Sequence, residues 1–312
     1  MSRPFDASDA TQDAAMNVMV TGATGLVGSQ LLPLLKQDGH EVITLTRRAP
    51  RNSSERQWDP AGKLPAATLE GIDAIIHLAG ENIGDSRWTA AKKKRIRDSR
   101  VIGTRNLAEA AAATGGQVKS FICASAIGFY GDRGHEELTE NSPPGTGFLP
   151  EVCREWEAAT GPARDAGIRV VNLRLGVVLS QEGGALAKML LPYKMCVGGI
   201  VGSGKQYWSW LTVDEAAQMF RFALQNTNLH GPVNAVSPQP VTNLEFTKAL
   251  GSVLHRPTIF PLPAFMARLV LGEMADDLIL GSTRVIPNRL LAAGYSFSHP
   301  EIGEALASAL RS

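Results

Sequence analysis

The sequence predicts an α/β fold, a doubly wound parallel sheet of the Rossmann type with a smaller α+β lobe at the C-terminal end. Three observations support this prediction. An apolar strand, a glycine-rich turn and a helix follow one another over residues 17–38. Short apolar runs then alternate with helical segments up to about residue 180, which is typical of parallel β-α-β units. Finally, 312 residues are enough for one large sheet and a further lobe.

The glycine-rich turn is the most informative stretch, and Gly22, Gly25 and Gly28 define it. A strand is expected before it at Asn17–Thr21 and a helix after it at Leu26–Gln37. In a dinucleotide-binding turn, the first glycine permits the sharp bend, the second lets backbone amides approach a pyrophosphate, and the third lets the helix pack on the strand. The unpaired N–H groups at the helix N-terminus then face the phosphates. A turn before an ordinary surface helix is the alternative.

The second strand, expected at Glu41–Thr46, bears on which dinucleotide is favoured. A fold of this type normally has an acidic residue about twenty positions after the turn, where it holds the adenosine ribose diol. This chain has no acid there, and Arg47 and Arg48 follow instead. A basic residue at this point suits a 2′-phosphate, so the sequence favours NADP over NAD. The alternative is that the two arginines only solvate a loop.

The remaining elements up to residue 180 follow in order. A loop rich in Pro, Asn, Ser and Gly is expected at 49–70. Near-continuous apolar runs indicate strands that are buried on both faces of the sheet, and the basic run 92–95 is interpreted as a solvated helix face. The expected strands are Asp73–Gly80, Ser120–Ser125 and Arg169–Leu175, and the expected helices are Thr89–Ala113 and Leu149–Ala163.

The C-terminal part has a less regular rhythm. We expect Asp214 to cap a helix that runs to about Gln225, and Asn243 to cap a helix that runs through Leu254. The other expected elements are an apolar helix between 183 and 199, a strand at Val233–Val236, a helix at Ala264–Leu271 and a short strand at Tyr295–Phe297. This organisation assigns 17–180 and 207–228 to a nucleotide-binding domain, and 181–206 and 229–312 to a substrate lobe.

Composition excludes several classes of function. Hydrophobic residues make up 44% of the chain, charged residues 20%, and the net charge is +1. This near-neutral balance gives no electrostatic case for binding nucleic acid or an anionic membrane. No apolar stretch reaches the roughly 18 residues that span a bilayer, and residues 1–15 lack the apolar run of a secretory signal. We expect a cytoplasmic protein in which 1–15 form a disordered tail.

Single residues with reactive side chains indicate little about function by themselves. Cys123, Cys153 and Cys196 are far apart and form no C-x-x-C pair, which argues against a disulfide framework or a zinc site. His77 lies within an apolar strand and is interpreted as a core histidine. Ser125 ends a central strand, where its hydroxyl could bond a substrate carbonyl or hydroxyl. The alternative is a serine that finishes a turn.

The sequence also contains two sets of short motifs, a broader one and a narrower one. The broader set is Thr21–Gly28, Asp73 with His77–Gly80, Gly103–Leu107, Ser125 with Tyr130 and Gly131, and Arg174–Gly176. Together they resemble the extended short-chain dehydrogenase/reductase superfamily over about residues 17–226. The narrower set is Leu78–Ile83, Arg87 with Trp88, Ala124–Gly131, Trp156 with Glu157, Ser209 with Trp210, Asn234–Pro238 and Arg284–Pro287. On these residues nearly the whole chain is similar to the nucleoside-diphosphate-sugar epimerase-like branch called "epimerase family protein".

The resemblance implies a site for NADP. It places a group of residues along the pyrophosphate, another at the adenosine 2′-phosphate and a third over the middle of the cofactor. These groups are Gly22, Thr24, Gly25, Leu26 and Val27; Thr46 and Arg47; and Leu78, Ala79 and Gly80, with Arg100 reaching in from the following helix. Ser125 and Glu81 line the nicotinamide end. The implied partner is a small-molecule substrate, with a nucleotide sugar as one candidate; a homodimer is a candidate assembly, and no nucleic acid, membrane or metal is expected.

The catalytic pair of the superfamily is missing. That pair is Tyr-x-x-x-Lys on the helix after the fifth strand, where the lysine lowers the pKa of the tyrosine. No tyrosine of this chain has a lysine four positions later. Alignment on Trp156 puts Leu149 and Cys153 where the pair would be. The candidate catalytic residues are therefore Ser125, Tyr130 and Glu155, with Glu151 as an alternative to Glu155.

Three hypotheses about function follow. The first is an NADP-dependent oxidoreductase or sugar-nucleotide epimerase with a substitute acid/base. The second is a catalytically silent NADP-binding sensor or scaffold. The third is a protein-interaction module that uses the segment around Trp208 and Trp210 as its surface.

Overall fold

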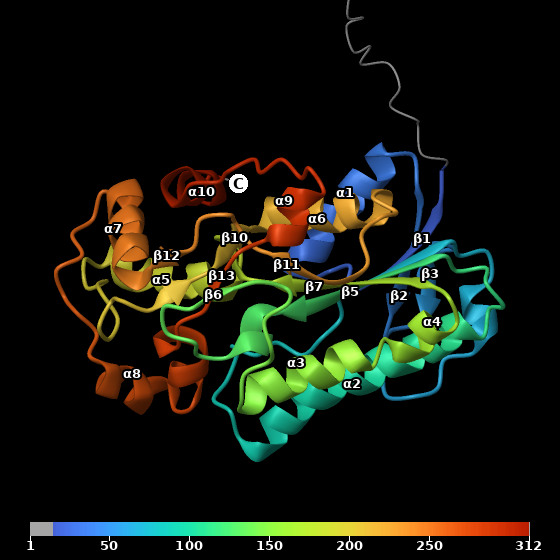
Figure 1. Ribbon diagram of the computed structural model, residues 1–312, viewed down its shortest axis with the longest axis horizontal. Helices are drawn as coiled ribbons and strands as arrows, with labels where there is room; N and C mark the ends of the chain where they lie inside the picture. Colours follow the sequence, from blue (N-terminus) through green and yellow to red (C-terminus); the bar gives the residue numbers. More distant parts are fainter. Residues whose placement is uncertain (1–14, 312) are drawn as a thin grey trace, which may run out of the picture.

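The computed structural model describes residues 15–311, and the expected tail at 1–15 lies, apart from Ala15, outside the described residues. A seven-stranded parallel sheet in the order β11-β7-β5-β4-β1-β2-β3 forms its centre (Figure 1). The chain runs from β1 outward to β3, then returns to the other side of β1 with β4. The predicted doubly wound sheet is confirmed. Its strands are β1 Asn17–Thr21, β2 Glu41–Thr46, β3 Glu55–Gln57, β4 Ala74–His77, β5 Ser120–Ala126, β7 Arg169–Leu175 and β11 Gly231–Ala235.

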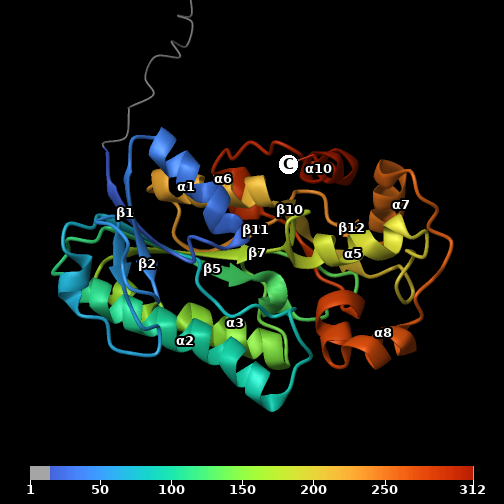
Figure 2. The same ribbon diagram turned by 180° about the vertical axis from the view of Figure 1, so that it is seen from behind.

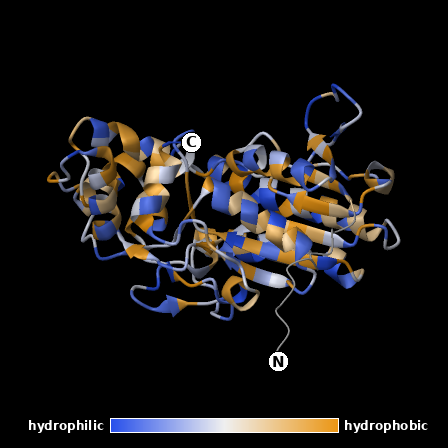
Figure 3. Ribbon diagram, turned by 90° about the horizontal axis from the view of Figure 1, so that it is seen from above, coloured by the Kyte–Doolittle hydropathy of each residue, from blue (hydrophilic) through white to orange (hydrophobic). Residues whose placement is uncertain are grey.

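Helices cover both faces of this sheet (Figures 1 and 2). On one face α1 (Leu26–Gln37) packs against α6 (Val213–Gln225). On the other face α2 (Ala90–Ala112) contacts both α3 (Phe148–Ala158) and α4 (Gly161–Asp165). Strands buried on both sides are mostly apolar, and the hydropathy colouring shows hydrophobic residues along the central strands (Figure 3).

A second core lies in the C-terminal elements, several of which gather at one end of the molecule (Figure 2). Trp208 and Trp210 belong to this core, with 6% and 1% of their surface exposed. The hypothesis that their segment is an interaction surface is therefore wrong. The elements outside the large sheet and its flanking helices are β6 Glu137–Leu138, β8 Val177–Leu179, α5 Gly184–Lys194, β9 Tyr207–Trp208, β10 Trp210–Thr212, β12 Val241–Thr242, α7 Asn243–Leu254, α8 Ala264–Leu271, the π-helix Asp276–Leu280, β13 Arg284–Val285, α9 Asn288–Ala292 and α10 Ile302–Ala309.

Several expected boundaries differ from the structure. The expected loop 49–70 contains β3, which adds an edge strand to β2, and a 3₁₀ helix at Ala66–Leu69. The expected helix Leu149–Ala163 is divided into α3 and α4. The break falls before Gly161 and Pro162, because proline cannot continue the i→i−4 hydrogen-bond ladder. β11 is an edge strand of the central sheet, although its residues fall within the range 229–312 that was assigned to the substrate lobe.

Two helix caps and one strand also differ. Thr212, not Asp214, caps α6, because its side chain accepts a hydrogen bond from the Glu215 N–H. Thr242, not Asn243, caps α7 in a capping box with Glu245. Residues 295–297 form no strand, and the Tyr295 ring packs edge to face on the rings of Phe222 and Phe297. Across residues 15–311, none of the helices combines the length and apolarity of a membrane span.

Candidate nucleotide-binding site

The turn between β1 and α1 is shaped by two close backbone approaches. Gly22 has a φ of +68°, and a Cβ there would lie 2.8 Å from the carbonyl carbon of Leu78 at the end of β4. A Cβ on Gly28 would lie 2.4 Å from the carbonyl oxygen of Gly22. Both positions therefore need glycine, because any side chain would push the turn away from β4 or α1 away from the turn. Thr24 and Gly25 are exposed at its tip.

The N-terminus of α1 is open to an anion. Its N-cap is Gly25, no side chain among the described residues caps it, and the first turn contains no acidic residue. The first N–H groups of the helix and its positive dipole end are therefore free to meet negative charge. Leu26 and Val27 begin the helix, and a Cβ on Gly183 would lie 3.2 Å from the Leu26 side chain. The loop before α5 thus borders the turn.

The two arginines after β2 differ in their surroundings. The guanidinium of Arg48 is bound by Glu55, with N and O 3.0 Å apart. Within the described part of the chain, no hydrogen bond or ion pair engages the guanidinium of Arg47, while Thr46 Oγ1 accepts from the Arg48 N–H at 3.3 Å. Arg47 also lines a cavity of about 380 Å³. Its other lining residues are Gln57, Trp58, Asp59, Lys63, Leu64 and Pro65.

The segment after β4 lies on the other side of the glycine turn, because β1 separates β4 from β2. Leu78, Ala79 and Gly80 continue from the strand, and Gly80 lies against the guanidinium of Arg100, whose Cζ is 3.3 Å from an ideal Cβ on Gly80. Arg100 Nη1 donates to the Glu81 carbonyl at 3.0 Å, and its guanidinium lies over the Trp156 ring at 5.0 Å. The structure thus brings Arg100 from α2 to the end of β4.

His77 is a core residue, which confirms its interpretation. Its side chain is fully buried, and both ring nitrogens have hydroxyl partners. Burial lowers the pKa of the imidazole to about 4, so the ring is neutral at physiological pH. The basic run 92–95 was interpreted as a solvated face, and this was wrong for Lys92, whose side chain is only 2% exposed. It lies beneath the loop after β4 because two carboxylates of that loop bind it.

Ser125 belongs to a buried polar network across three neighbouring strands. Ser125 on β5, Arg174 on β7 and Asn234 on β11 are direct register partners. Ser125 Oγ donates to Glu157 Oε1 at 2.7 Å. Arg174 binds the same carboxylate through Nε at 2.7 Å and Nη2 at 2.8 Å. The network neutralises a buried guanidinium, and the Ser125 hydroxyl within it belongs to a residue that is only 2% exposed.

Tyr130 completes that network. Its hydroxyl accepts from Arg174 Nη1 at 2.9 Å and donates to Asn234 Oδ1 at 2.7 Å. The residue is fully buried, and burial raises the pKa of its phenol. This phenol is buried, makes two hydrogen bonds and is hard to ionise. It is therefore poorly placed to exchange protons with a substrate. This geometry favours a structural role for Tyr130 over the expected catalytic one.

The next residues lie on α3, the helix that carries the catalytic pair in the superfamily that this chain resembles. Glu155 lies toward α2, where its carboxylate is 2.6 Å from Arg97 Nε, so the structure does not bring it to Ser125 or Tyr130. Leu149 and Cys153 do face the turn after β5, within 3.3 and 3.7 Å of a Cβ on Gly128. Burial raises the pKa of the Cys153 thiol to about 12, which keeps it neutral.

Four residues of this region were not singled out by the sequence. Lys63 lies in a loop whose composition gives no signal for a ligand, and Lys92 lies within a run of four basic residues. Glu157 was noted only as part of a motif, and Asn234 likewise. The partners and surroundings of these side chains depend on where distant elements pack, so local patterning could not identify these positions. No group of three or more His, Cys, Asp or Glu side chains suited to a metal occurs within residues 15–311.

An open glycine turn before a helix, at the point where the strand order of a doubly wound sheet reverses, defines a dinucleotide-binding class of protein. Comparison with known sequences gives the family. Residues 18–235 match the NAD dependent epimerase/dehydratase family, and the chain belongs to it. Residues 262–309 match a second family, a domain of unknown function named DUF1731.

Relatives in other organisms are similar over nearly their whole length. Epimerase family protein ML0860 of Mycobacterium leprae is 42% identical over 293 residues, which cover 94% of this chain and 95% of that protein. Human epimerase family protein SDR39U1 is 37% identical over 294 residues, covering 93% and 98%. The predicted membership of the epimerase family branch is therefore confirmed.

Two solved structures share the architecture. The crystal structure of human SDR39U1 (isoform 2) with NADPH has a TM-score of 0.87 and 35% identity, and the match covers 95% of this chain and 99% of that one. A nucleoside-diphosphate sugar epimerase from Corynebacterium glutamicum has a TM-score of 0.79 and 39% identity, covering 95% of this chain and 58% of that one. These likenesses extend through the C-terminal elements as well as the central sheet.

Proposed function

We propose that this protein binds NADP(H) across the turn between β1 and α1, with the 2′-phosphate at Arg47. The observation that carries the proposal is the difference between the two arginines after β2. Arg48 is neutralised by Glu55 at 3.0 Å, whereas Arg47 lines the neighbouring cavity with its guanidinium unpaired among the described residues. Lys63 lines the same cavity and adds a second positive charge. Two cations beside one cavity favour a phosphorylated ribose over a free diol.

The order of the strands in the sheet indicates where the rest of the cofactor would bind. The pyrophosphate would lie at the open N-terminus of α1, where free N–H groups and the helix dipole favour negative charge. The nicotinamide half would then extend past Gly80 toward Glu81, on the opposite side of β1 from Arg47. That human SDR39U1 was solved with NADPH supports this assignment.

The same geometry favours cofactor binding without the standard proton-transfer chemistry of the superfamily. Leu149 and Cys153, which the alignment on Trp156 puts at the positions of the catalytic pair, lie beside Gly128. Leucine transfers no proton, and a thiol with a pKa near 12 is a poor acid or base at neutral pH. Tyr130 and Ser125 are engaged in the buried network. We therefore favour an NADP(H)-binding protein whose catalysis, where it occurs, does not use a Tyr–Lys pair.

A second candidate function is an epimerase or oxidoreductase that acts on a nucleotide sugar or another small carbonyl compound. The observation in its favour is the name of the Corynebacterium glutamicum neighbour, a nucleoside-diphosphate sugar epimerase at 39% identity. Hydride turnover of NADPH with a panel of sugar nucleotides and small carbonyls distinguishes the two. Tight binding of NADPH without turnover on any of them supports the first function over the second.

Calorimetric titration with NADPH and NADH tests the cofactor proposal, using Arg47→Ser and its neighbour Arg48→Ser as matched variants. Loss of a charge-assisted phosphate contact costs about 1.5–3 kcal/mol, which is roughly ten- to a hundredfold in Kd. We expect this loss for NADPH with Arg47→Ser and little change for NADH. Arg48→Ser should affect both nucleotides slightly. Equal weakening of NADPH and NADH by Arg47→Ser would exclude the 2′-phosphate role.

A further inference from the structure

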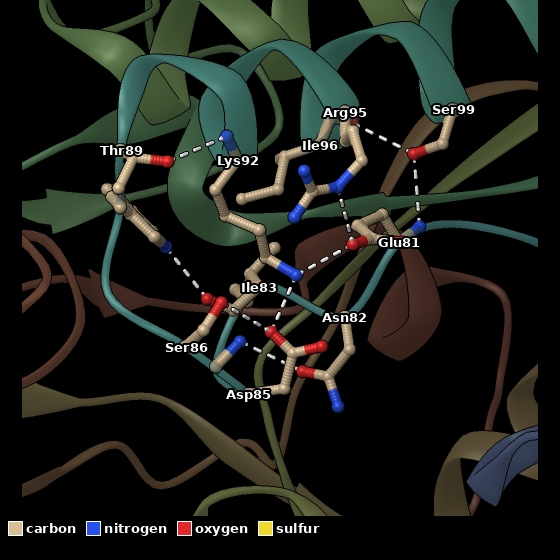
Figure 4. Close-up of polar contacts among 12 residues, drawn as sticks. Glu81, Asn82, Ile83, Asp85, Ser86, Thr89, Lys92, Arg95, Ile96 and Ser99 are labelled. Atoms are coloured by element: carbon tan, nitrogen blue, oxygen red, sulfur yellow. Dashed lines mark hydrogen bonds and ion pairs between the residues drawn. The ribbon is translucent and has the colours of Figure 1, made fainter.

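The ammonium group of Lys92 is buried between two carboxylates. The side chain projects from the first turn of α2, and only 2% of it is exposed. Its Nζ lies 2.7 Å from Glu81 Oε1 and 2.6 Å from Asp85 Oδ1 (Figure 4). A lysine is rarely buried unless it is paired, because removing its charge from water is costly. Lys92 therefore joins the helix to the loop Glu81–Trp88, which we name the β4–α2 loop.

Glu81 is held at three points by α2. Its carboxylate binds Lys92, its backbone N–H donates to Ser99 Oγ at 3.0 Å, and its carbonyl accepts from Arg100 at 3.0 Å. Arg95 Nε adds a longer contact to the carboxylate at 3.3 Å. The bond from Lys92 is the main cause that lowers the pKa of the Glu81 carboxyl, which is ionised at neutral pH. These contacts hold Glu81, directly after Gly80, in one defined position.

The far end of the β4–α2 loop is fixed to the C-terminal elements. Arg87 Nε donates to the Val270 carbonyl at 2.9 Å, and its guanidinium also binds the Leu269 carbonyl at the end of α8. Lys188 of α5 binds the Gly84 carbonyl. Within the loop, the Trp88 indole donates to the Ile83 carbonyl at 2.8 Å. The loop therefore spans from α8 and α5 to the end of β4, and its β4 end depends on Lys92.

The position of this loop links it to one half of the proposed cofactor. The order β4-β1-β2 puts the β4–α2 loop and Arg47 on opposite sides of the glycine turn. A dinucleotide with its 2′-phosphate at Arg47 and its pyrophosphate on α1 directs its nicotinamide half toward Glu81. We infer that Lys92 is a positioning residue for the nicotinamide half of NADP(H), acting through Glu81 and the β4–α2 loop. This inference rests on the proposed function.

Lys94 of the same helix is a solvated lysine and contrasts with Lys92. The side chain of Lys94 is 76% exposed and pairs with Asp98, one turn along α2. Such an exposed i,i+4 pair contributes little to stability. Lys94 is therefore a matched control for Lys92, with the same residue type two positions away on the same helix.

The experiment compares two ligands in the full chain. NADPH occupies both halves of the site, whereas adenosine 2′,5′-bisphosphate carries the 2′-phosphate without the nicotinamide. We expect Lys92→Met to weaken NADPH about tenfold, and to leave the Kd of adenosine 2′,5′-bisphosphate within about twofold. Lys92→Arg, which keeps the charge, should recover part of the loss, and Lys94→Met should change neither Kd.

Asp85→Asn is a second, milder variant, because Asp85 is half exposed and its removal leaves Lys92 paired with Glu81. It should weaken NADPH selectively and by a smaller factor, and it serves if Lys92→Met does not fold. Equal weakening of both ligands would show that Lys92 only supports the fold, and unchanged NADPH binding in both variants would also overturn the inference. A wild-type protein that binds neither ligand would instead remove the proposed function, and the inference with it.

Discussion

The hydroxyl of Thr21 and the imidazole of His77 form a buried hydrogen bond, with Oγ1 and Nδ1 2.7 Å apart. Thr21 Oγ1 also accepts from the backbone N–H groups of Leu78 and Ala79, each at 3.1 Å. Its own proton is therefore donated to Nδ1, and Nε2–H of the ring donates to Thr104 Oγ1 at 3.0 Å. One tautomer of a neutral histidine thus fastens the end of β4 to the end of β1, where the glycine turn begins.

His77 should make the stability of the protein depend on pH. Its native pKa is about 4, against 6.5 for the ordinary side chain. Between these pH values the unfolded chain binds a proton that the native state does not. The contribution of His77 to the free energy of unfolding is therefore complete above pH 6.5 and falls as the pH drops toward 4. The loss attributable to this residue is at most about 3 kcal/mol. Urea unfolding at several pH values should show a shallower dependence in His77→Gln, and an identical dependence would contradict this account.

Gly28→Ala should damage both stability and nucleotide binding. The new methyl group would lie 2.4 Å from the Gly22 carbonyl oxygen, so the turn or α1 must move. Such overpacking typically costs about 1–3 kcal/mol. Gly303→Ala in α10 is the control, because nothing lies within 4 Å of its Cβ and alanine favours helix. Thermal unfolding and NADPH titration should show a loss for the first variant and an unchanged or slightly raised Tm for the second.

Lys63→Ala should reduce the preference for NADPH over NADH. Lys63 lines the cavity beside Arg47, so its charge adds to the field at the expected 2′-phosphate. The contact is more exposed than a buried pair, and we expect an effect of about 1 kcal/mol, several-fold in Kd, that decreases with added salt. Titrations at two ionic strengths measure it. A variant that binds NADPH as tightly as the wild type at low salt would place Lys63 outside the site.

The variant Tyr130→Phe distinguishes a structural role of the Tyr130 hydroxyl from a catalytic one. Removing the hydroxyl leaves Arg174 and Asn234 each without one buried partner, which should cost about 1–3 kcal/mol of unfolding free energy. Because the phenol is enclosed, the Kd of NADPH and any turnover should stay unchanged in the folded variant. Tyr207→Phe, whose hydroxyl has no hydrogen-bond partner among the described residues, should lower stability much less. A selective loss of turnover with unchanged stability would restore Tyr130 as a catalytic candidate.

Much of the nucleotide-binding half could be predicted because its signals are local. The bounds of β1, α1 and β2 agree with the expected ones, since an apolar run, a glycine spacing and a following helix all lie within thirty residues. The short edge strand β3 was missed, because three polar residues carry no alternation and depend on pairing with β2. The caps at Thr212 and Thr242 were each missed in favour of a neighbouring Asp or Asn, since several polar residues compete at each helix start.

The features of the candidate site likewise divide into those that the sequence predicts and those that only the structure shows. The sequence by itself determined that a glycine turn joins a strand to a helix, that a basic residue follows the second strand, and that no Tyr-x-x-x-Lys is present. Only the tertiary structure decided that Arg48 is paired while Arg47 is not, that Lys92 is buried, and that Tyr130 is enclosed by residues 44 and 104 positions away. The reason is physical: the state of a charged or hydroxyl group depends on its partners and its burial, and the order of strands in the sheet brings those partners together from distant parts of the chain.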